Sequence, residues 1–290
     1  MIDASLIDNA FGTISGPYAA IIGANPSKGA RSPKLWNAAF TANRNPSVMV
    51  PLDVTSAGLA PLLAALDADP YFVGGAIAVP HKQATAHWLR DRVTQEAAAI
   101  GAVNCLFRRD DRLWGTNTDG EAARVCLERA AGSLQSKHVV LLGLGGAGKA
   151  VAAFLAKRAE QLSLAGRNFD SVQAYATAVG SRAVRWDSLR SVLPDADVAV
   201  NCTSVGSAAA GMADGSPLSD ELVWLLRPAA LVYDIIYDPR PTRLLAAAAA
   251  RGLLWLDGAG MNLEQAMLAY IYAVGGDQVA VRAAMEKAAA

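Results

Sequence analysis

Cysteine, histidine and net charge are scarce in this chain, and each shortage argues against a class of protein. Among 290 residues, only three are cysteine and three are histidine. Cys105, Cys126 and Cys202 show no CxxC spacing, so we expect small buried thiols in a reducing compartment. The histidines share no metal-ligand spacing, which argues against a metal site. Basic and acidic residues number 26 each and cancel, which argues against a nucleic-acid or anionic-membrane surface.

Long apolar runs are also absent. Charges or glycines interrupt every apolar run before it reaches the roughly 20 residues that a membrane-spanning helix needs. Residues 1–5 have neither the basic start nor the apolar core of a signal peptide, so we expect a cytoplasmic protein. Apolar residues make up 53% and charged residues 18% of the chain, which is typical of a compact globular protein with room for two ordinary domains.

The first part of the chain alternates short apolar runs with amphipathic stretches. Two amphipathic stretches, residues 57–66 and 83–100, are predicted helices. Apolar runs with the length of strands are residues 18–23, 47–51 and 75–79. Residues 103–107 and 113–115 are two further predicted strands, joined by the charged turn 108–112. The alternation predicts an α/β domain with a largely parallel sheet.

A second alternation begins after residue 136. Its predicted strands are residues 139–142, 162–165, 198–201, 231–234 and 253–256. Helical segments separate these strands, which predicts a doubly wound dinucleotide-binding fold. The tail from about residue 262 to 290 has the pattern of a helix with one apolar face. That pattern allows it to cap either domain, and we expect it to return to the first.

A glycine-rich loop links the first of these strands to a predicted helix. Gly143, Gly145 and Gly148 satisfy the GxGxxG pattern. In a nucleotide-binding loop the first glycine permits a tight turn, and the second lets a pyrophosphate approach the backbone. The third lets the helix and the strand pack closely. The strand-loop-helix context therefore favours a dinucleotide cofactor.

The end of the next predicted strand bears on which dinucleotide binds. Arg167 is a candidate for the 2′-phosphate of NADP or for stacking on adenine. A solvated surface arginine is an equally good interpretation. Asp170 would repel a phosphate, and no second basic residue follows within the loop. The cofactor is therefore expected to be NAD or NADP, with a lean towards NAD.

Two titratable residues suggest a reaction. Lys82 follows a Pro-His turn, and Asp119 lies in the segment Asn-Thr-Asp-Gly at the predicted domain boundary, where ligand clefts often lie. By base rate the lysine is a solvated surface residue and the aspartate a turn former or helix cap. Oxidation of an alcohol by hydride transfer, however, needs a base for the hydroxyl proton, and a lysine beside a carboxylate can supply one.

Six segments, in order, resemble motifs of the shikimate/quinate dehydrogenase family over essentially the whole chain. They are residues 79–82, 101–104, 117–120, 201–206, 234–239 and 258–265. The resemblance implies an N-terminal α/β substrate domain, residues 1–117 with the helical tail from about 262. It also implies a C-terminal Rossmann domain, residues 118–261. The implied reaction is the reversible oxidation of a ring hydroxyl of shikimate, quinate or a close analogue with NAD or NADP.

The resemblance also implies a role for individual residues. The catalytic pair is Lys82 and Asp119. The substrate-binding residues are Ser32, Asn104, Tyr237 and Gln265. The cofactor-binding residues are Gly143, Gly145, Gly146, Ala147, Arg167, Thr203, Ile235 and Gly258.

Three positions depart from the pattern of the family. Ala30 replaces the first of two serines that usually bind the substrate carboxylate, and Arg31 is a candidate substitute. Ala76 and Ala78 stand where an asparagine and a threonine usually face the substrate hydroxyls. Three lost hydrogen-bonding side chains, at about 1 kcal/mol each, would weaken transition-state binding of shikimate about 100-fold. The chemistry is expected to be retained and the specificity altered.

A different class of function remains open at this stage. A nucleotide-binding regulatory protein with this fold and no turnover would explain the lost substrate contacts. Lys82 and Asp119 argue against it, because a sensor has no need of a proton-transfer pair. The expected partner is a small ring hydroxy acid, and the chain is expected to be a monomer or a homodimer.

Overall fold

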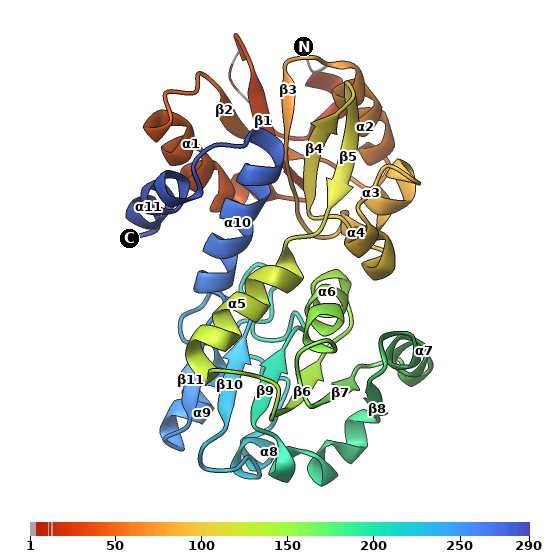
Figure 1. Cartoon of the computed structure of the whole chain (residues 1–290), viewed down its shortest axis with the longest axis vertical. Helices are drawn as coiled ribbons and strands as arrows, with labels where there is room; N and C mark the ends of the chain where they lie inside the picture. Colours follow the sequence, from red (N-terminus) through yellow and green to blue (C-terminus); the bar gives the residue numbers. More distant parts are fainter. Residues whose placement is uncertain (1–3, 11, 13) are drawn as a thin grey trace. The chain divides into compact units, whose positions relative to one another are not determined.

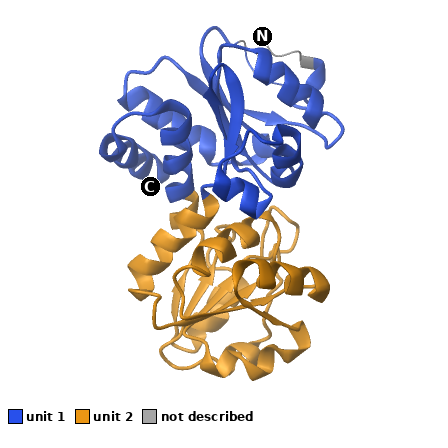
Figure 2. Ribbon diagram, turned by 45° about the vertical axis from the view of Figure 1, so that its right-hand side comes forward, with its two compact units in different colours: residues 1–118, 263–290 blue, residues 119–262 orange. Residues whose placement is uncertain are grey.

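The computed structural model describes residues 4–10, 12 and 14–290. The chain divides into two compact units, residues 1–118 with 263–290 (unit 1) and residues 119–262 (unit 2) (Figure 2). The expectation drawn from residues 1–5 falls partly on residues 1–3, which lie outside the described ranges. Within those ranges no helix is long and apolar enough to cross a membrane. Each unit has helices packed around its own sheet, which confirms the α/β fold class (Figure 1).

Unit 1 is built on a five-stranded sheet with the order β2-β1-β3-β4-β5. Its strands are β1 (Tyr18–Gly23), β2 (Val48–Asp53), β3 (Phe72–Ile77), β4 (Cys105–Arg109) and β5 (Arg112–Thr116). β1 is parallel to β2 and β3, whereas β4 is antiparallel to β3 and β5. The parallel pairing predicted from the alternation holds for β1, β2 and β3, and the two strands predicted on either side of the charged turn 108–112 form the hairpin of β4 and β5. The antiparallel pairing of β4 with β3 was not predicted. Asp110 and Asp111 both have positive φ (50° and 57°), so β4 turns directly into β5 and leaves no room for a crossover helix.

Helices cover both faces of this sheet. They are α1 (Ser32–Ala42), α2 (Leu59–Ala68), α3 (Lys82–Leu89), α4 (Gln95–Ile100), residues 263–274 of α10 (Ala259–Val274), and α11 (Gln278–Ala289). α2, α3 and α4 pack on the face of Tyr18, Ala20 and Ile22, and α1, α10 and α11 on the face of Ala19 and Ile21. Successive residues of β1 thus serve two cores, which is the expected pattern of a strand buried on both sides.

The helical tail returns to unit 1, as expected. Tyr270 of α10 packs in the same cluster as Trp36 and Phe40 of α1, with ring centroids 5.2 Å from each. Two helices form the tail where one was predicted, because Gly275 and Gly276 both have positive φ and Asp277 caps α11 by accepting a hydrogen bond from Val279 N–H.

The predicted helix 83–100 is also two helices, α3 and α4. Arg90 ends α3 with φ of 58°, and the segment that follows joins the edge of β5. Gly115 N–H donates to the carbonyl of Arg92, and Thr94 N–H donates to the carbonyl of Gly115. Thr94 then caps α4 through its side chain. Periodicity alone misses this break, because the pairing partner lies about twenty residues along the chain.

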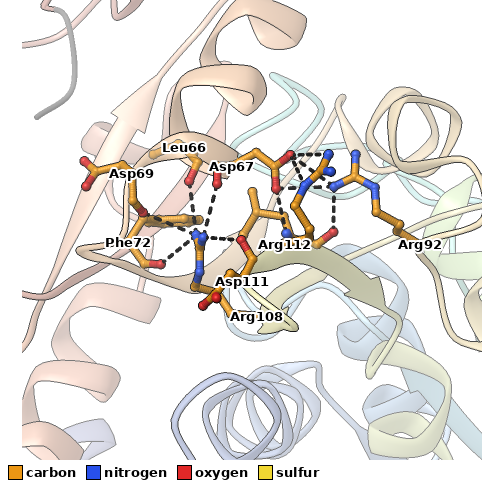
Figure 3. Close-up of polar contacts among 9 residues, drawn as sticks. Leu66, Asp67, Asp69, Phe72, Arg92, Arg108, Asp111 and Arg112 are labelled. Carbon is orange, nitrogen blue, oxygen red and sulfur yellow. Dashed lines mark hydrogen bonds and ion pairs between the residues drawn. The ribbon is translucent and has the colours of Figure 1, made fainter.

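Two charged side chains hold the hairpin of β4 and β5 against the end of α2 (Figure 3). Asp67 accepts hydrogen bonds from Arg92, Arg112 and the backbone N–H of Leu113. Arg108 donates to five backbone carbonyls, those of Leu66, Asp67, Asp69, Phe72 and Asp111. The network lies at the amino end of β3, opposite the strand ends that carry Lys82 and Ser32, so we assign it a structural role.

Unit 2 is built on a six-stranded parallel sheet with the order β11-β10-β9-β6-β7-β8. Its strands are β6 (His138–Leu142), β7 (Gln161–Ala165), β8 (Arg182–Val184), β9 (Val198–Asn201), β10 (Leu231–Asp234) and β11 (Leu254–Leu256). From β6 the chain adds β7 and β8 on one side and then β9, β10 and β11 on the other. This is the doubly wound order, with a topological switch point between β6 and β9.

Helices also cover both faces of the second sheet. α5 (Asp119–Ala131), α6 (Gly146–Leu155) and α7 (Phe169–Val179) lie on one face. The other face is covered by α8 (Asp220–Trp224), α9 (Arg243–Ala250) and two short 3-10 helices, residues 186–191 and 193–195. The Rossmann-type prediction is confirmed. Strand β8 was not predicted, because its three residues begin with an exposed arginine and lie at the edge of the sheet.

Candidate active site

The carboxyl ends of β1, β2 and β3 gather several polar residues of unit 1. Ala24 N–H, just after β1, donates to the carbonyl of Val79, just after β3, at 3.3 Å. Asp53, at the end of β2, accepts from the backbone N–H and the hydroxyl of Ser27. These contacts fix the loop that leads to the buried Ser32 at the start of α1 and bring it to the sheet edge that carries Lys82. Asp53 and Ser27 were not singled out from the sequence.

Hydrogen bonds connect Asn104 to Gln265 within unit 1, and a neighbouring backbone bond involves Lys82. The carbonyl of Lys82, the first residue of α3, accepts from Val103 N–H at 2.9 Å. The next side chain, Asn104, donates from Nδ2 to Thr118 Oγ1 at 3.0 Å and accepts from Thr118 N–H at 2.8 Å. Thr118 Oγ1 lies 3.2 Å from the carbonyl oxygen of Gln265, to which it donates. The structure therefore brings two of the predicted residues, Asn104 and Gln265, together at Thr118, to which the sequence analysis assigned no role.

Asp119 follows Thr118 and is the first residue of α5 and of unit 2. It is buried, with 4% of its surface exposed. Gly120 behind it needs to be glycine, because a Cβ there would lie 2.4 Å from the carbonyl oxygen of Ala150 in α6. This close approach of α5 to α6 fixes the start of α5 within unit 2. The assignment of Asp119 to catalysis stays a prediction.

The glycine-rich loop has the expected conformation. Gly143 has φ of 95°, and a Cβ there would lie 2.7 Å from Cγ2 of Thr203. Gly148 in α6 lies against the same loop, since a Cβ there would lie 2.0 Å from the carbonyl oxygen of Gly143. Gly145 is exposed and has no heavy atom within 4 Å of an added Cβ. The backbone at Gly145, Gly146 and Ala147 is thus accessible at the switch point between β6 and β9.

The remaining cofactor-binding candidates also follow strand ends in unit 2. Gly258, after β11, approaches the segment after β10 so closely that a Cβ would lie 1.9 Å from the carbonyl oxygen of Ile235. Arg167 is exposed just after β7, and Tyr237 is half-buried after β10. Tyr237 therefore belongs to a different unit from Ser32, Asn104 and Gln265. Its contact with the substrate stays a prediction, as do the cofactor contacts.

A buried carboxylate joins the two loops that carry Thr203, Ile235 and Tyr237. Asp234, at the end of β10, is fully buried and accepts hydrogen bonds from Asn201 Nδ2, Thr242 Oγ1 and Ile236 N–H. Asn201 Oδ1 in turn accepts from the backbone N–H and the hydroxyl of Thr203. Burial, together with nearby Asp257, raises the pKa of Asp234 to about 6 against these hydrogen bonds. A buried aspartate and asparagine at two strand ends are the sequence signal that could have revealed this network.

Replacing Asp234 with asparagine removes one titratable carboxyl group from the folded protein. Because its folded-state pKa of about 6 lies above the ordinary 3.8, the native chain binds more protons than the unfolded chain between these values. The stabilising contribution is therefore full below about pH 4 and is lost as the pH rises through about 6.

We expect the free energy of unfolding of the wild type to fall relative to that of Asp234→Asn by up to about 3 kcal/mol over this range, at about 1.4 kcal/mol per pKa unit. Urea unfolding of both proteins from about pH 4 to about pH 7.5 measures this difference. Parallel pH profiles for the two proteins would contradict it.

Three alanines of unit 1 lie in or against one apolar cluster. Ala76 of β3 is buried in the cluster that contains Trp36 and Tyr270, and Ala30 and Ala78 pack against it. These are the three positions at which the family resemblance predicts hydrogen-bonding side chains. The three alanines that depart from the family pattern therefore form a single apolar region, which is continuous with the core under α1 and α10.

The chain was compared with known families and structures. Residues 21–106 match the shikimate dehydrogenase substrate binding domain, and residues 126–213 match the shikimate / quinate 5-dehydrogenase family. The shikimate dehydrogenase (NADP(+)) of Methylobacterium radiotolerans is 37% identical over 264 residues, 88% of this chain and 90% of that protein. The chain belongs to the shikimate dehydrogenase family. The corresponding enzyme of Methylocella silvestris is 39% identical over 203 residues, 69% of this chain and 70% of its own.

Solved structures of the shikimate dehydrogenase family have the same fold. The shikimate 5-dehydrogenase of Thermus thermophilus, in complex with NADP(H) and shikimate, aligns with a TM-score of 0.80 at 29% identity. The alignment covers 94% of this chain and 99% of that one. These relatives support the dehydrogenase interpretation and not the regulatory alternative. They place the cofactor in the NAD(P) class, and they do not support the lean towards NAD, because the curated relatives are named for NADP.

Proposed function

We propose that this protein is an NADP-dependent dehydrogenase that oxidises a ring hydroxyl of shikimate or a close analogue, and catalyses the reverse reduction. The observation that carries the proposal is a set of hydrogen bonds in unit 1 that links Asn104 to Gln265 through Thr118 and binds Val103, the residue before Asn104, to the backbone carbonyl of Lys82. These bonds join residues from four of the segments that resemble the family's motifs, 79–82, 101–104, 117–120 and 258–265. Asp119 follows Thr118 directly, so one ordered segment presents both substrate-binding and catalytic candidates.

The proposed roles follow from the chemistry of alcohol oxidation. The cofactor, when bound, accepts a hydride from the carbon that bears the hydroxyl group. Lys82 takes the hydroxyl proton and returns it in the reverse direction, and Asp119 is the second catalytic residue. Asn104, whose orientation the hydrogen bonds to Thr118 fix, binds a substrate oxygen together with Ser32, Gln265 and Tyr237. Because Asn104 needs no rearrangement to bind, little side-chain entropy is lost there.

The choice of NADP rests on the curated relatives, which are named as NADP(+) enzymes, and on Arg167 at the end of β7. An arginine at this position suits a 2′-phosphate, whereas NAD enzymes usually carry a carboxylate there to bind the ribose hydroxyls. The three cysteines are free and buried, which agrees with a role in a reducing compartment such as the cytoplasm.

The preferred substrate presents fewer polar groups to unit 1 than shikimate does, because Ala30, Ala76 and Ala78 offer it only methyl groups. A substrate region against these alanines gains from apolar contact and leaves no carboxylate or hydroxyl unpaired. Candidates are ring hydroxy acids in which one polar group of shikimate is missing or displaced.

Restoring two of the lost hydrogen-bonding groups should shift the specificity towards shikimate. We expect Ala30→Ser with Ala78→Thr to raise kcat/KM for shikimate about 10- to 30-fold, at about 1 kcal/mol per restored hydrogen bond. Both alanines are only partly buried, so the added atoms displace little of the core. Initial rates of NADPH formation with shikimate, quinate and deoxy analogues measure the change.

Ala38→Ser is the matched control for this experiment. Ala38 is half-buried in α1 and does not pack against the alanine cluster, so its replacement should leave every rate unchanged. An unchanged ratio of shikimate to deoxy-analogue activity in the double variant would show that these alanines do not face the substrate. If the wild type oxidised no ring acid of the panel with either cofactor, the proposed function would be wrong.

A further inference from the structure

A second arginine, Arg185, follows β8, the strand paired with the one that leads to Arg167. β7 and β8 are parallel, and their last residues, Ala165 and Val184, are paired in register. The residues that leave these two strands therefore emerge side by side at the carboxyl edge of the sheet. They are Gly166 and Arg167 after β7, and Arg185 after β8. The loop after β7 itself holds only one basic residue. Arg185 follows the neighbouring strand, so only the pairing of β7 and β8 brings it to this edge.

The side chain of Arg185 is directed towards the segment that carries Arg167. Its guanidinium carbon lies 4.0 Å from the centroid of the Phe169 ring, and Phe169 begins α7 two residues after Arg167. Stacking on an aromatic face holds a guanidinium group in place without using its N–H donors, which lie in the guanidinium plane. Arg185 is exposed, so these donors are accessible to an anion.

We propose that Arg185 and Arg167 together bind the 2′-phosphate of NADP, and that Arg185 is a specificity-determining residue for the cofactor. The inference rests on the proposed function, because it assumes a dinucleotide at the carboxyl edge of unit 2. Two guanidinium groups match a phosphate that carries nearly two negative charges, and planar N–H donors suit its oxygens. Asp170 and Asp187 are the nearby acidic residues in sequence, and both are exposed and solvated. Arg185 thus supplies the second positive charge that the loop after β7 lacks.

The experiment measures binding without turnover. Isothermal titration calorimetry with 2′,5′-ADP and with 5′-AMP compares two probes that differ by the 2′-phosphate alone. We expect Arg185→Gln to weaken 2′,5′-ADP about 10- to 100-fold, the range of a charge-assisted hydrogen bond, and to leave 5′-AMP unchanged. Arg185→Lys keeps the charge but loses the planar stack, so it should recover part of the affinity.

The controls separate this inference from the proposed function. Arg182→Gln removes an exposed arginine at the start of the same strand and should change neither probe. If the wild type bound both probes equally, the choice of NADP would be wrong. If the wild type preferred 2′,5′-ADP and Arg185→Gln kept that preference, or weakened both probes equally, the role of Arg185 alone would be wrong.

Discussion

Turnover of Lys82→Met falls at least about 100-fold, because the variant lacks the base that takes the hydroxyl proton, a contribution of about 10²- to 10⁴-fold in comparable enzymes. The fold should be unaffected. Lys82 contributes its backbone carbonyl to the bond with Val103, and methionine keeps both that carbonyl and the length of the side chain. The main chain at the start of α3, and with it the orientation of Asn104, is therefore preserved.

Two measurements identify the cause of the lost activity. The dissociation constant for NADPH, measured by fluorescence titration, should be unchanged, because Lys82 belongs to unit 1 and the glycine-rich loop to unit 2. Lys34→Met, which removes an exposed lysine from α1, should keep full activity. Wild-type turnover in Lys82→Met would remove the lysine from the mechanism, and weakened NADPH binding would indicate a misfolded variant or a cofactor-binding role.

The second large effect is expected for Gly148→Ala. A Cβ at this position would lie 2.0 Å from the carbonyl oxygen of Gly143 and 3.2 Å from Cβ of Cys202. The carbonyl of Gly143 belongs to a tightly turned main chain, and the main chain of the buried Cys202 fixes its Cβ, so no side-chain rotation relieves the overlap. We expect a loss of about 3 kcal/mol or more in the free energy of unfolding, at or above the upper end for overpacked sites. Displacement of α6 from the loop should also abolish measurable NADPH binding.

Gly145→Ala is the matched control for Gly148→Ala. Gly145 has φ of −72° and open space around an added Cβ, so its replacement should change the free energy of unfolding by no more than about 0.5 kcal/mol. NADPH binding should still weaken about 10-fold or more, because the methyl group stands where a pyrophosphate approaches the backbone. Equal stability of the two variants in urea would contradict the packing argument. Full NADPH affinity in Gly145→Ala would show that the loop does not hold the pyrophosphate.

The strands of unit 2 were largely predictable because a parallel sheet covered on both faces requires short, continuous apolar runs. β6, β9 and β10 are such runs, and all were predicted within a residue of their bounds. The same criterion fails for β8, whose first residue is an exposed arginine. It also cannot distinguish parallel from antiparallel pairing, which is why the antiparallel pairing of β4 with β3 in unit 1 was not predicted.

The residues of the candidate site also divide into those that a local motif predicts and those that only the fold reveals. Lys82, Asp119 and the glycines lie in short local motifs, and a motif is a property of neighbouring residues that any reader of the chain can recognise. Thr118 and Asp234 also lie in recognisable segments, but their importance comes from hydrogen bonds to Asn104, Asn201 and Thr242. A local pattern does not predict which residues these bonds pair, because each bond joins two elements of the fold.

The sequence alone was therefore sufficient to identify the family and the two α/β parts and to propose candidate site segments, since these depend on local composition and on the order of motifs. Strand order and register determine the contacts between distant residues. They place the guanidinium of Arg185 on the ring of Phe169 in the segment after β7, join the loops after β9 and β10 through Asp234, and gather Ala30, Ala76 and Ala78 in or against one apolar cluster. Contacts between residues so distant along the chain form only when the sheet pairs in one particular way, so no local pattern contains them.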